Sequence, residues 1–257
     1  MNHNCPALYG TMGPIINMEN LISNFTGSQE KFVRSISPED EKQYYEQVLK
    51  ESPGIITLGN EQLDLFAGTL LIFLALSGIT NIYKMFTGDF NAIFGVIIDF
   101  MIIAPGFILH ELSHKYMALK KKFYARYVLY EKGIWLTLLT ALIGIGFIVP
   151  GFVAILGRPN KEENGEISIV GPATNIFFAL IGLSLIGISQ GILGITGGVL
   201  LYIFYRIVFI NGFIALFNLL PFWNLDGAKV FKWNKIYWFS LTLISLLMFL
   251  FSIFYSP

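Results

Sequence analysis

The chain has 257 residues, of which 54% are hydrophobic and only 13% are charged. Soluble domains carry about 25% charged residues, so this chain has too few polar side chains to cover a soluble surface. A disordered, coiled-coil or disulfide-scaffold protein is excluded, and the composition indicates a membrane protein with several spans. The net charge is zero, which gives no electrostatic support for a nucleic-acid partner.

The first 60 residues are polar, and we expect them to form a small cytoplasmic region ahead of a membrane-embedded domain at 61–257. Within this region a helix is predicted to start at Ser37, with Pro38 at its first position and acidic residues in its first turn. That helix should end before Ser52-Pro53-Gly54. The region contains no catalytic motif.

Long segments without charge fill the rest of the chain. About 20 apolar residues span a bilayer. The segments predict an all-α polytopic membrane protein with about five transmembrane helices, a membrane-dipping strand or hairpin segment and a small polar N-terminal region. The spans are expected in Leu65–Tyr83, Phe90–Leu109, twice within Ile167–Leu225 with a turn near Gly191–Gly198, and in Ile236–Pro257, while Gly133–Gly157 is ambiguous.

The positions of the basic residues predict the orientation in the cell membrane. Lysine and arginine are enriched in cytoplasmic loops. They follow the Phe90–Leu109 span, precede Ile167 and follow Leu225, whereas the loops on the other side offer only Lys84. The protein is therefore expected to be a multi-pass membrane protein whose His114 and Asp226 ends face the cytoplasm. The basic residues concerned are Lys115, Lys120, Lys121, Lys122, Arg126, Arg158, Lys161, Lys229, Lys232 and Lys235.

The segment His110-Glu111-Leu112-Ser113-His114 is an H-E-x-x-H sequence. Residues four apart share one face of a helix, so both imidazoles can bind one ion, and zinc is the expected metal. Glu111 lies beside that face, where it can take a proton from a water molecule activated by the metal. The alternative is a polar helix end that reaches the interface, although such residues are costly in a membrane without a partner.

A zinc site of this kind needs a third protein ligand, and Asp226 is the strongest candidate. It follows Pro221, which ends or kinks a helix, so non-helical backbone can turn Asp226 back toward the site. Gly227 allows a close approach of the chain. The alternative is that Asp226 caps a helix where the chain leaves the membrane.

His110 and Asp226 can share an ion only if an even number of crossings separates them. The two crossings within Ile167–Leu225 satisfy this condition, unless Gly133–Gly157 crosses as well. We therefore predict that Gly133–Gly157 dips into the membrane and returns, with its bend at Pro150-Gly151. Such backbone must be shielded by protein or paired as strands.

Two further motifs follow the H-E-x-x-H sequence, namely Gly171-Pro172-Ala173-Thr174-Asn175 and Phe217-Asn218-Leu219-Leu220-Pro221 with Leu225-Asp226-Gly227. In this order they resemble the site-2 protease family of intramembrane zinc metalloproteases, over about residues 90–235. The resemblance implies that His110, His114 and Asp226 bind zinc and that Glu111 is the catalytic acid and base. It also implies that Asn218 and Asn175 hydrogen-bond the backbone of membrane-spanning protein substrates or line their path. A membrane-dipping strand segment belongs to the same pattern.

Two other classes of protein remain open. CAAX-type membrane endopeptidases also carry H-E-x-x-H but take a downstream glutamate ligand from a helix. Glu162, Glu163 and Glu166 are the candidates, and we expect them in a polar loop with Gly165. The second class is a non-catalytic membrane scaffold or metal-binding protein, against which Glu111 argues because a structural site needs no base.

Asp99 and Arg206 are charged residues inside expected spans, at depths that match within about 2 Å at 1.5 Å per helical residue. Buried charges in membranes usually pair. We predict an ion pair between them, with separate water-facing groups as the alternative.

Overall fold

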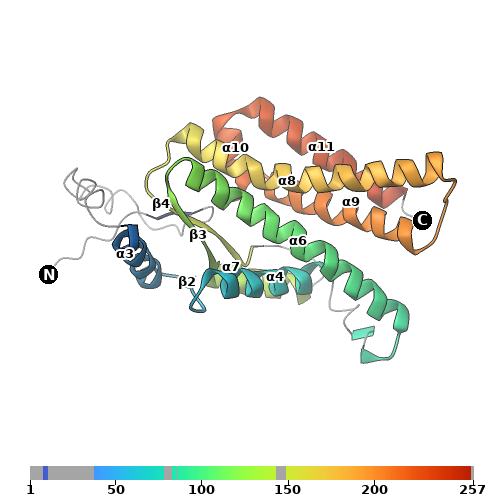
Figure 1. Cartoon of the computed structure of the whole chain (residues 1–257), viewed down its shortest axis with the longest axis horizontal. Helices are drawn as coiled ribbons and strands as arrows, with labels where there is room; N and C mark the ends of the chain where they lie inside the picture. Colours follow the sequence, from blue (N-terminus) through green and yellow to red (C-terminus); the bar gives the residue numbers. More distant parts are fainter. Residues whose placement is uncertain (1–7, 11–37, 78–82, 85, 143–148, 256–257) are drawn as a thin grey trace.

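The structure is a computed structural model that describes residues 8–10, 38–77, 83–84, 86–142 and 149–255. Four long helices form its main body: α6 (Phe90–Lys120), α8 (Lys161–Gly187), α9 (Val199–Asn218) and α11 (Lys235–Phe254). Within the described part of the chain, these four are long and apolar enough to cross a membrane. Figure 1 shows them running along the long axis of the molecule. The predicted fold class, a mostly helical polytopic membrane protein, is confirmed.

The first expected span corresponds to α4 (Glu61–Ser77), which has 17 residues, and its predicted continuation through 78–82 lies outside the described residues. The turn predicted near Gly191–Gly198 is confirmed. The short π-helix η1 (Ile188–Ile192) extends α8, and α9 begins at Val199.

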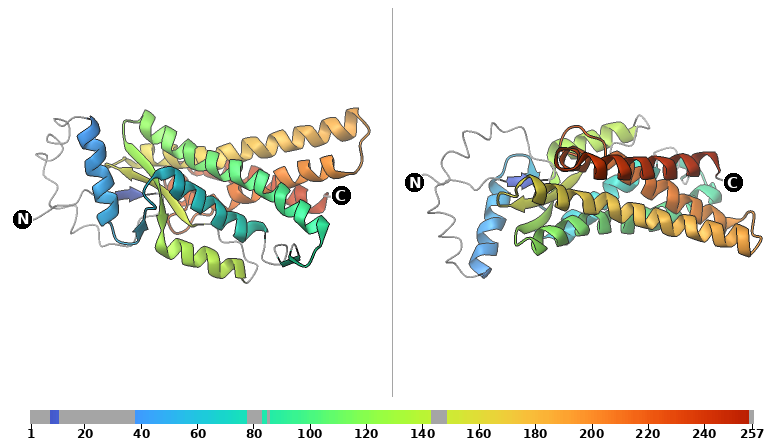
Figure 2. Two further views of the ribbon diagram at one scale, coloured as in Figure 1. Left: turned by 60° about the horizontal axis from the view of Figure 1, so that its bottom comes forward. Right: turned by 90° about the horizontal axis from the view of Figure 1, so that it is seen from above.

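A four-stranded antiparallel sheet lies at one end of the helices (Figures 1 and 2). Its order is β1-β4-β3-β2, formed by β1 (Leu8–Gly10), β4 (Gly151–Leu156), β3 (Tyr124–Tyr130) and β2 (Ile55–Ile56). Helix α3 (Pro38–Glu51) lies beside the sheet and ends before Ser52, as predicted. Since β1 and β2 precede residue 60, the sheet joins the polar region to the rest of the chain.

The Gly133–Gly157 segment leaves the sheet and returns to it. Helix α7 (Glu131–Leu142) starts where β3 ends, and β4 runs back antiparallel to β3. A Cβ on Gly133 would overlap the carbonyl oxygen of Val149, so the outgoing and returning chain are in close contact. Residues 143–148, between α7 and β4, lie outside the described residues.

The expectation that this segment consists of strands was only partly correct. Its first half is helix α7, because the run from Ile134 to Leu142 contains four leucines, which favour helix. Among the described residues of the segment, strand structure is limited to β4, whose partner β3 lies upstream of the segment. The signal that sequence analysis overlooked is the run of aromatic and β-branched residues in Tyr124–Tyr130, which favours a strand.

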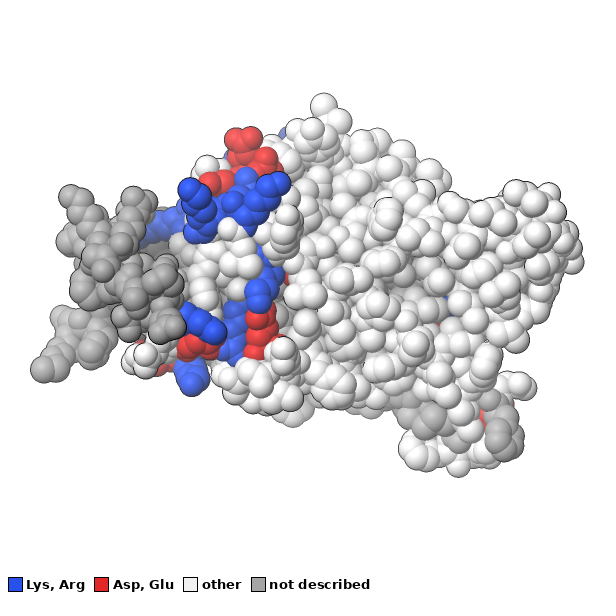
Figure 3. Space-filling model, in the orientation of Figure 1, with Lys and Arg blue, Asp and Glu red and all other residues white. Residues whose placement is uncertain are grey.

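Charged side chains gather at the end of the molecule that carries the sheet (Figure 3). On this face the surface of the long helices is almost free of charge. Arg126 of β3, only 3% exposed, holds this end together through ion pairs with Asp64 of α4, at 2.9 Å, and with Glu46 of α3. Glu61 of α4 pairs in addition with Lys115 of α6.

The predicted ion pair between Asp99 and Arg206 is confirmed. The Nε atom of Arg206, on α9, donates to Oδ1 of Asp99, on α6, at 2.8 Å. Asp99 is 3% exposed. The pair therefore links α6 to α9 inside the apolar part of the protein.

Candidate metal centre

Helix α6 presents the H-E-x-x-H sequence in its last third. His110 and His114 are one turn apart, so their rings lie on the same face, and their Nε2 atoms are 3.1 Å apart. Both residues are almost completely buried. The helix therefore supplies two nitrogen ligands that point to one position.

Asp226 reaches this position because the chain stops being helical after α9. Helix α9 ends at Asn218, three residues before Pro221, and the short helix α10 (Asp226–Trp233) begins at Asp226 itself. A Cβ on Gly227 would overlap the carbonyl of Leu219, so this fold back requires glycine. This is the close approach expected at Gly227.

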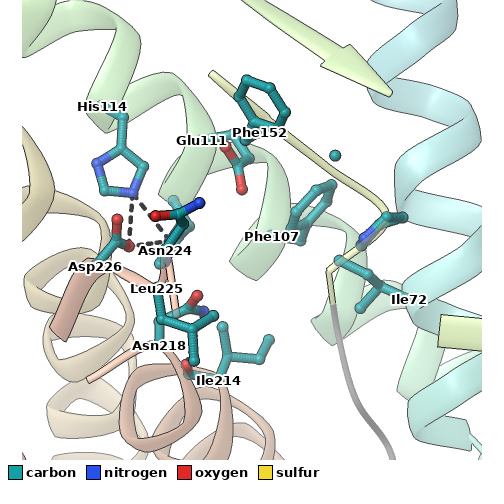
Figure 4. A pocket seen from close by; sticks show the side chains of 13 residues that line it. Ile72, Phe107, Glu111, His114, Phe152, Ile214, Asn218, Asn224, Leu225 and Asp226 are labelled. Carbon is teal, nitrogen blue, oxygen red and sulfur yellow. Dashed lines mark hydrogen bonds and ion pairs between the residues drawn. The ribbon is translucent and has the colours of Figure 1, made fainter. Parts of the chain in front are cut away.

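The structure brings His110, His114 and Asp226 together. Oδ2 of Asp226 lies 3.3 Å from Nε2 of His110 and 3.0 Å from Nε2 of His114. The three ligand atoms all lie within 4.8 Å of one another, and within the described residues this is the group of three such side chains able to hold a metal ion. Figure 4 shows His114 and Asp226 facing each other across this position.

The hydrogen bond that Nδ1 of each ring makes determines whether Nε2 of the same ring can bind a metal. Nδ1 of His114 lies 2.6 Å from the carbonyl oxygen of Ile167, and Nδ1 of His110 lies 2.6 Å from Oδ1 of Asn175. Carbonyl oxygens only accept hydrogen bonds, so both Nδ1 atoms carry the proton in the neutral rings. Both Nε2 atoms then present lone pairs to each other and to a carboxylate oxygen. A cation satisfies this arrangement, and two histidines with one aspartate are a suitable ligand set for zinc.

Gly171 of α8 forms the wall next to the imidazoles. A Cβ at this position would overlap Nε2 of His114 and lie 2.7 Å from Nε2 of His110. The position therefore admits only glycine, and it leaves room beside the two nitrogens.

The charges around Asp226 favour its ionised form. Burial acts to raise the pKa of Asp226, but His114, His110 and Lys229 together lower that pKa well below its ordinary value. Lys229 lies one turn along α10, with its Nζ 3.8 Å from Oδ1 of Asp226. Burial lowers the pKa of Lys229 to about 8, while the negative charges of Asp226 and Glu111 oppose the shift. The carboxylate thus has Lys229 on one oxygen and the histidines on the other.

Glu111 lies beside the three residues, and its Oε2 is buried without a hydrogen-bond partner in the described part of the chain. A buried carboxylate oxygen without a partner is costly, which is typical of a group kept for function. The cavity in front of it is lined by Phe107, Gly151 and Phe152, among others (Figure 4). β4 therefore lies next to this carboxylate.

The two asparagines named in the sequence analysis occupy different positions. Asn218 lines the cavity, and its Nδ2 donates to the carbonyl of Ile214. Asn175 is fully buried and contacts His110. Sequence reasoning missed this contact, although Gly171 and Asn175 are four residues apart and so share the face of α8 that meets the imidazoles.

The glutamates that would serve a CAAX-type site are placed differently from our expectation. They belong to the first two turns of α8, not to a loop, because Asn160 and Glu163 form a capping box that starts the helix at Lys161. Glu166 forms an ion pair with Lys121. In the part of the chain that the structure describes, Glu162, Glu163 and Glu166 do not belong to the group formed by His110, His114 and Asp226.

Two proteins of Methanocaldococcus jannaschii are similar to this chain. The first, “Putative zinc metalloprotease MJ0611”, is 36% identical over 144 residues, which are 55% of this chain and 73% of that protein. The second, “Zinc metalloprotease MJ0392”, is 29% identical over 143 residues, which are 55% of this chain but only 35% of that protein. No family profile and no solved structure matches the chain. The identity and coverage of the first relative show that this chain belongs to a family of zinc metalloproteases.

Proposed function

We propose that the chain is an intramembrane zinc protease of the site-2 type, which hydrolyses peptide bonds of transmembrane substrates near the cytoplasmic face. The observation that carries the proposal is the convergence of His110, His114 and Asp226 beside Glu111, whose Oε2 has no hydrogen-bond partner among the described residues. Both histidines and Glu111 lie on α6, a helix apolar enough to span a membrane. The names of the two relatives support the protease chemistry and the choice of zinc.

In this proposal His110, His114 and Asp226 hold the metal. A zinc ion bound there would polarise the scissile carbonyl and increase the acidity of the attacking water. Glu111 takes the proton from that water and delivers it to the leaving amine, so one carboxylate acts first as base and then as acid. Its Oε2, buried and without a hydrogen-bond partner among the described residues, suits both steps.

The free edge of β4 is the proposed place for the substrate backbone. β1 pairs with Ala154 to Leu156 and leaves the edge at Gly151–Val153 without a strand partner among the described residues. Gly151 and Phe152 line the cavity that contains Glu111. A substrate helix hides its carbonyls in its own hydrogen bonds, and pairing with this edge would hold a locally unwound segment open. Asn218 lines the same cavity and can bind the substrate backbone.

The test compares Glu111→Gln with the wild-type protein and with Glu131→Gln, an exposed glutamate of α7. Each is reconstituted in liposomes with a panel of labelled transmembrane peptides, and zinc content is measured alongside cleavage. Glu111→Gln should lose cleavage by at least 100-fold while it retains zinc, because the ligands are untouched. Glu131→Gln should behave as wild type.

The same experiment distinguishes the proposed protease from the alternative, a non-catalytic metal-binding protein. That class predicts bound zinc but no cleavage by the wild-type protein. Cleavage that persists in full in the Glu111→Gln variant would reject the role given to this residue. For unidentified natural substrates, Glu111→Gln also serves as a trap, followed by mass spectrometry of the bound protein.

A further inference from the structure

Three helices meet behind His110 through side-chain amides. Nδ2 of Asn175, on α8, donates to the carbonyl oxygen of Gly106 on α6 and to Oδ1 of Asn211 on α9, both at 3.0 Å. Nδ2 of Asn211 donates to the carbonyl oxygen of Ile207, one turn back on its own helix, at 3.0 Å. His110, Asn175 and Asn211 are each at most 2% exposed. Water therefore cannot replace any of these partners.

The direction of this chain of hydrogen bonds is fixed at both ends. The carbonyl oxygen of Ile207 can only accept, so the amide nitrogen of Asn211 must face it and Oδ1 of Asn211 faces Asn175. Two oxygens, one from Gly106 and one from Asn211, therefore face the amide nitrogen of Asn175. Oδ1 of Asn175 is left for Nδ1 of His110.

The opposite orientation of Asn175 would disable the histidine as a ligand. Its amide nitrogen would then face Nδ1 of His110, and the ring would have to carry its proton on Nε2, the atom that faces His114 and Asp226. The same rotation would set Oδ1 of Asn175 against the oxygens of Gly106 and Asn211. Asn211 therefore opposes the harmful orientation without touching the metal position.

We propose that Asn211 is a positioning residue of the metal centre, which acts through Asn175 to keep the proton of His110 on Nδ1 and its Nε2 free. The inference rests on the proposed function, since the role given to Asn211 concerns the same metal. Close packing of α6 against Asn211 supports this role, because a Cβ on Gly106 would lie 2.8 Å from Oδ1 of Asn211. Glycine at this position lets the Asn211 amide approach α6.

The test is a double-mutant cycle between Asn211→Leu and Asn175→Asp, with zinc affinity measured on the full chain by chelator competition. Asn211→Leu alone removes one of the two oxygens that orient Asn175, and we expect zinc to bind about tenfold more weakly. A carboxylate accepts through either oxygen, so in the Asn175→Asp background the proton of His110 no longer depends on Asn211. There Asn211→Leu should cause no loss of affinity.

Selective labelling gives a second readout, because the chain contains only three histidines. In zinc-free, histidine-labelled protein, nitrogen chemical shifts should show His110 protonated on Nδ1 in the wild type, with a growing Nε2-protonated fraction in Asn211→Leu. If Asn211→Leu does not fold, Asn211→Ala removes the same oxygen and is measured in its place.

The outcomes are distinct. An equal loss of affinity in both backgrounds would mean that Asn211 only supports packing, and no loss in either would mean that it has no role, so both results overturn the inference. An unchanged proton position on His110 overturns it as well. These results would leave the protease proposal standing if Glu111→Gln still abolishes cleavage. A wild-type protein that binds no zinc would overturn both proposals.

Discussion

Gly171 and Asn175 show how single residues of α8 adapt the helix to the metal centre. Asn175 orients the ring of His110, and Gly171 provides the space into which both Nε2 atoms point. Neither residue is one of the three ligand candidates. The site thus depends on a supporting layer of side chains that is as specific as the ligands.

Replacement of Gly171 by alanine should abolish zinc binding without unfolding the protein. The added Cβ would overlap Nε2 of His114 and displace the rings, whereas alanine by itself favours helix by about 1 kcal/mol over glycine. We expect the zinc content of Gly171→Ala to fall to background, as measured by metal analysis of the purified protein.

Gly187→Ala is the matched control, since this glycine ends the same helix and its Cβ would meet nothing within 4 Å. It should retain full zinc. If Gly171→Ala also retained full zinc, the imidazoles would not occupy the positions described here.

Among the elements, α6 and α9 are joined by the ion pair between Asp99 and Arg206. Arg206 is also 5.1 Å from the ring of Phe209, a distance at which a guanidinium is attracted to an aromatic face. Both helices belong to the metal centre, since α6 carries the histidines and α9 carries Asn211 and Asn218. The pair therefore fixes the relative position of two elements that build the site.

Loss of one partner of this ion pair should destabilise the protein more than exchange of the two charges. Arg206→Leu leaves the carboxylate of Asp99 buried and unpaired, which is expected to cost about 3 kcal/mol or more. The swap of Asp99→Arg with Arg206→Asp should recover a large part of this stability, as measured by thermal unfolding in detergent. A swapped protein no more stable than the single variant would count against the pair as a stabilising contact.

At the scale of the whole molecule, the charged end and the metal centre lie together. Lysine and arginine side chains gather at the end of the molecule that carries the sheet, whereas the opposite end of α8 and α9 is apolar (Figures 1 and 3). Lysine and arginine favour the cytoplasmic side of a membrane. We therefore keep the prediction that the centre opens toward the cytoplasm.

Cysteine labelling tests this orientation. The chain has one cysteine, so single cysteines can be introduced in a Cys5→Ser background. Ile192→Cys, at an exposed position next to the α8–α9 turn, should react with an impermeant maleimide on intact cells, because the predicted orientation places that end outside. Lys232→Cys, on α10 at the charged end, should react only after permeabilisation. The reverse pattern would place the centre outside the cell.

Several features of this protein follow from its sequence alone. The spacing of His110 and His114 places them on one face of any helix, because an α-helix repeats every 3.6 residues. The long apolar segments predict membrane helices, and the parity of crossings predicts that Gly133–Gly157 returns to the side from which it came. The first two properties depend only on neighbouring residues, whereas the third adds one assumption, that His110 and Asp226 share an ion. The helical state of α7 and the helical position of Glu163 also have local causes, a leucine-rich run and a capping box, which the sequence analysis did not use.

Other features were decided only by tertiary structure. The pairing of β3 with β4 depends on contacts between separate strands that local periodicity does not show. The partner of Asn175 likewise depends on tertiary contacts: as a sequence pattern it suggested a substrate contact, whereas in the fold it meets His110, 65 residues away. A buried polar group takes the partner that packing brings within reach, and packing of three helices cannot be derived from any one of them.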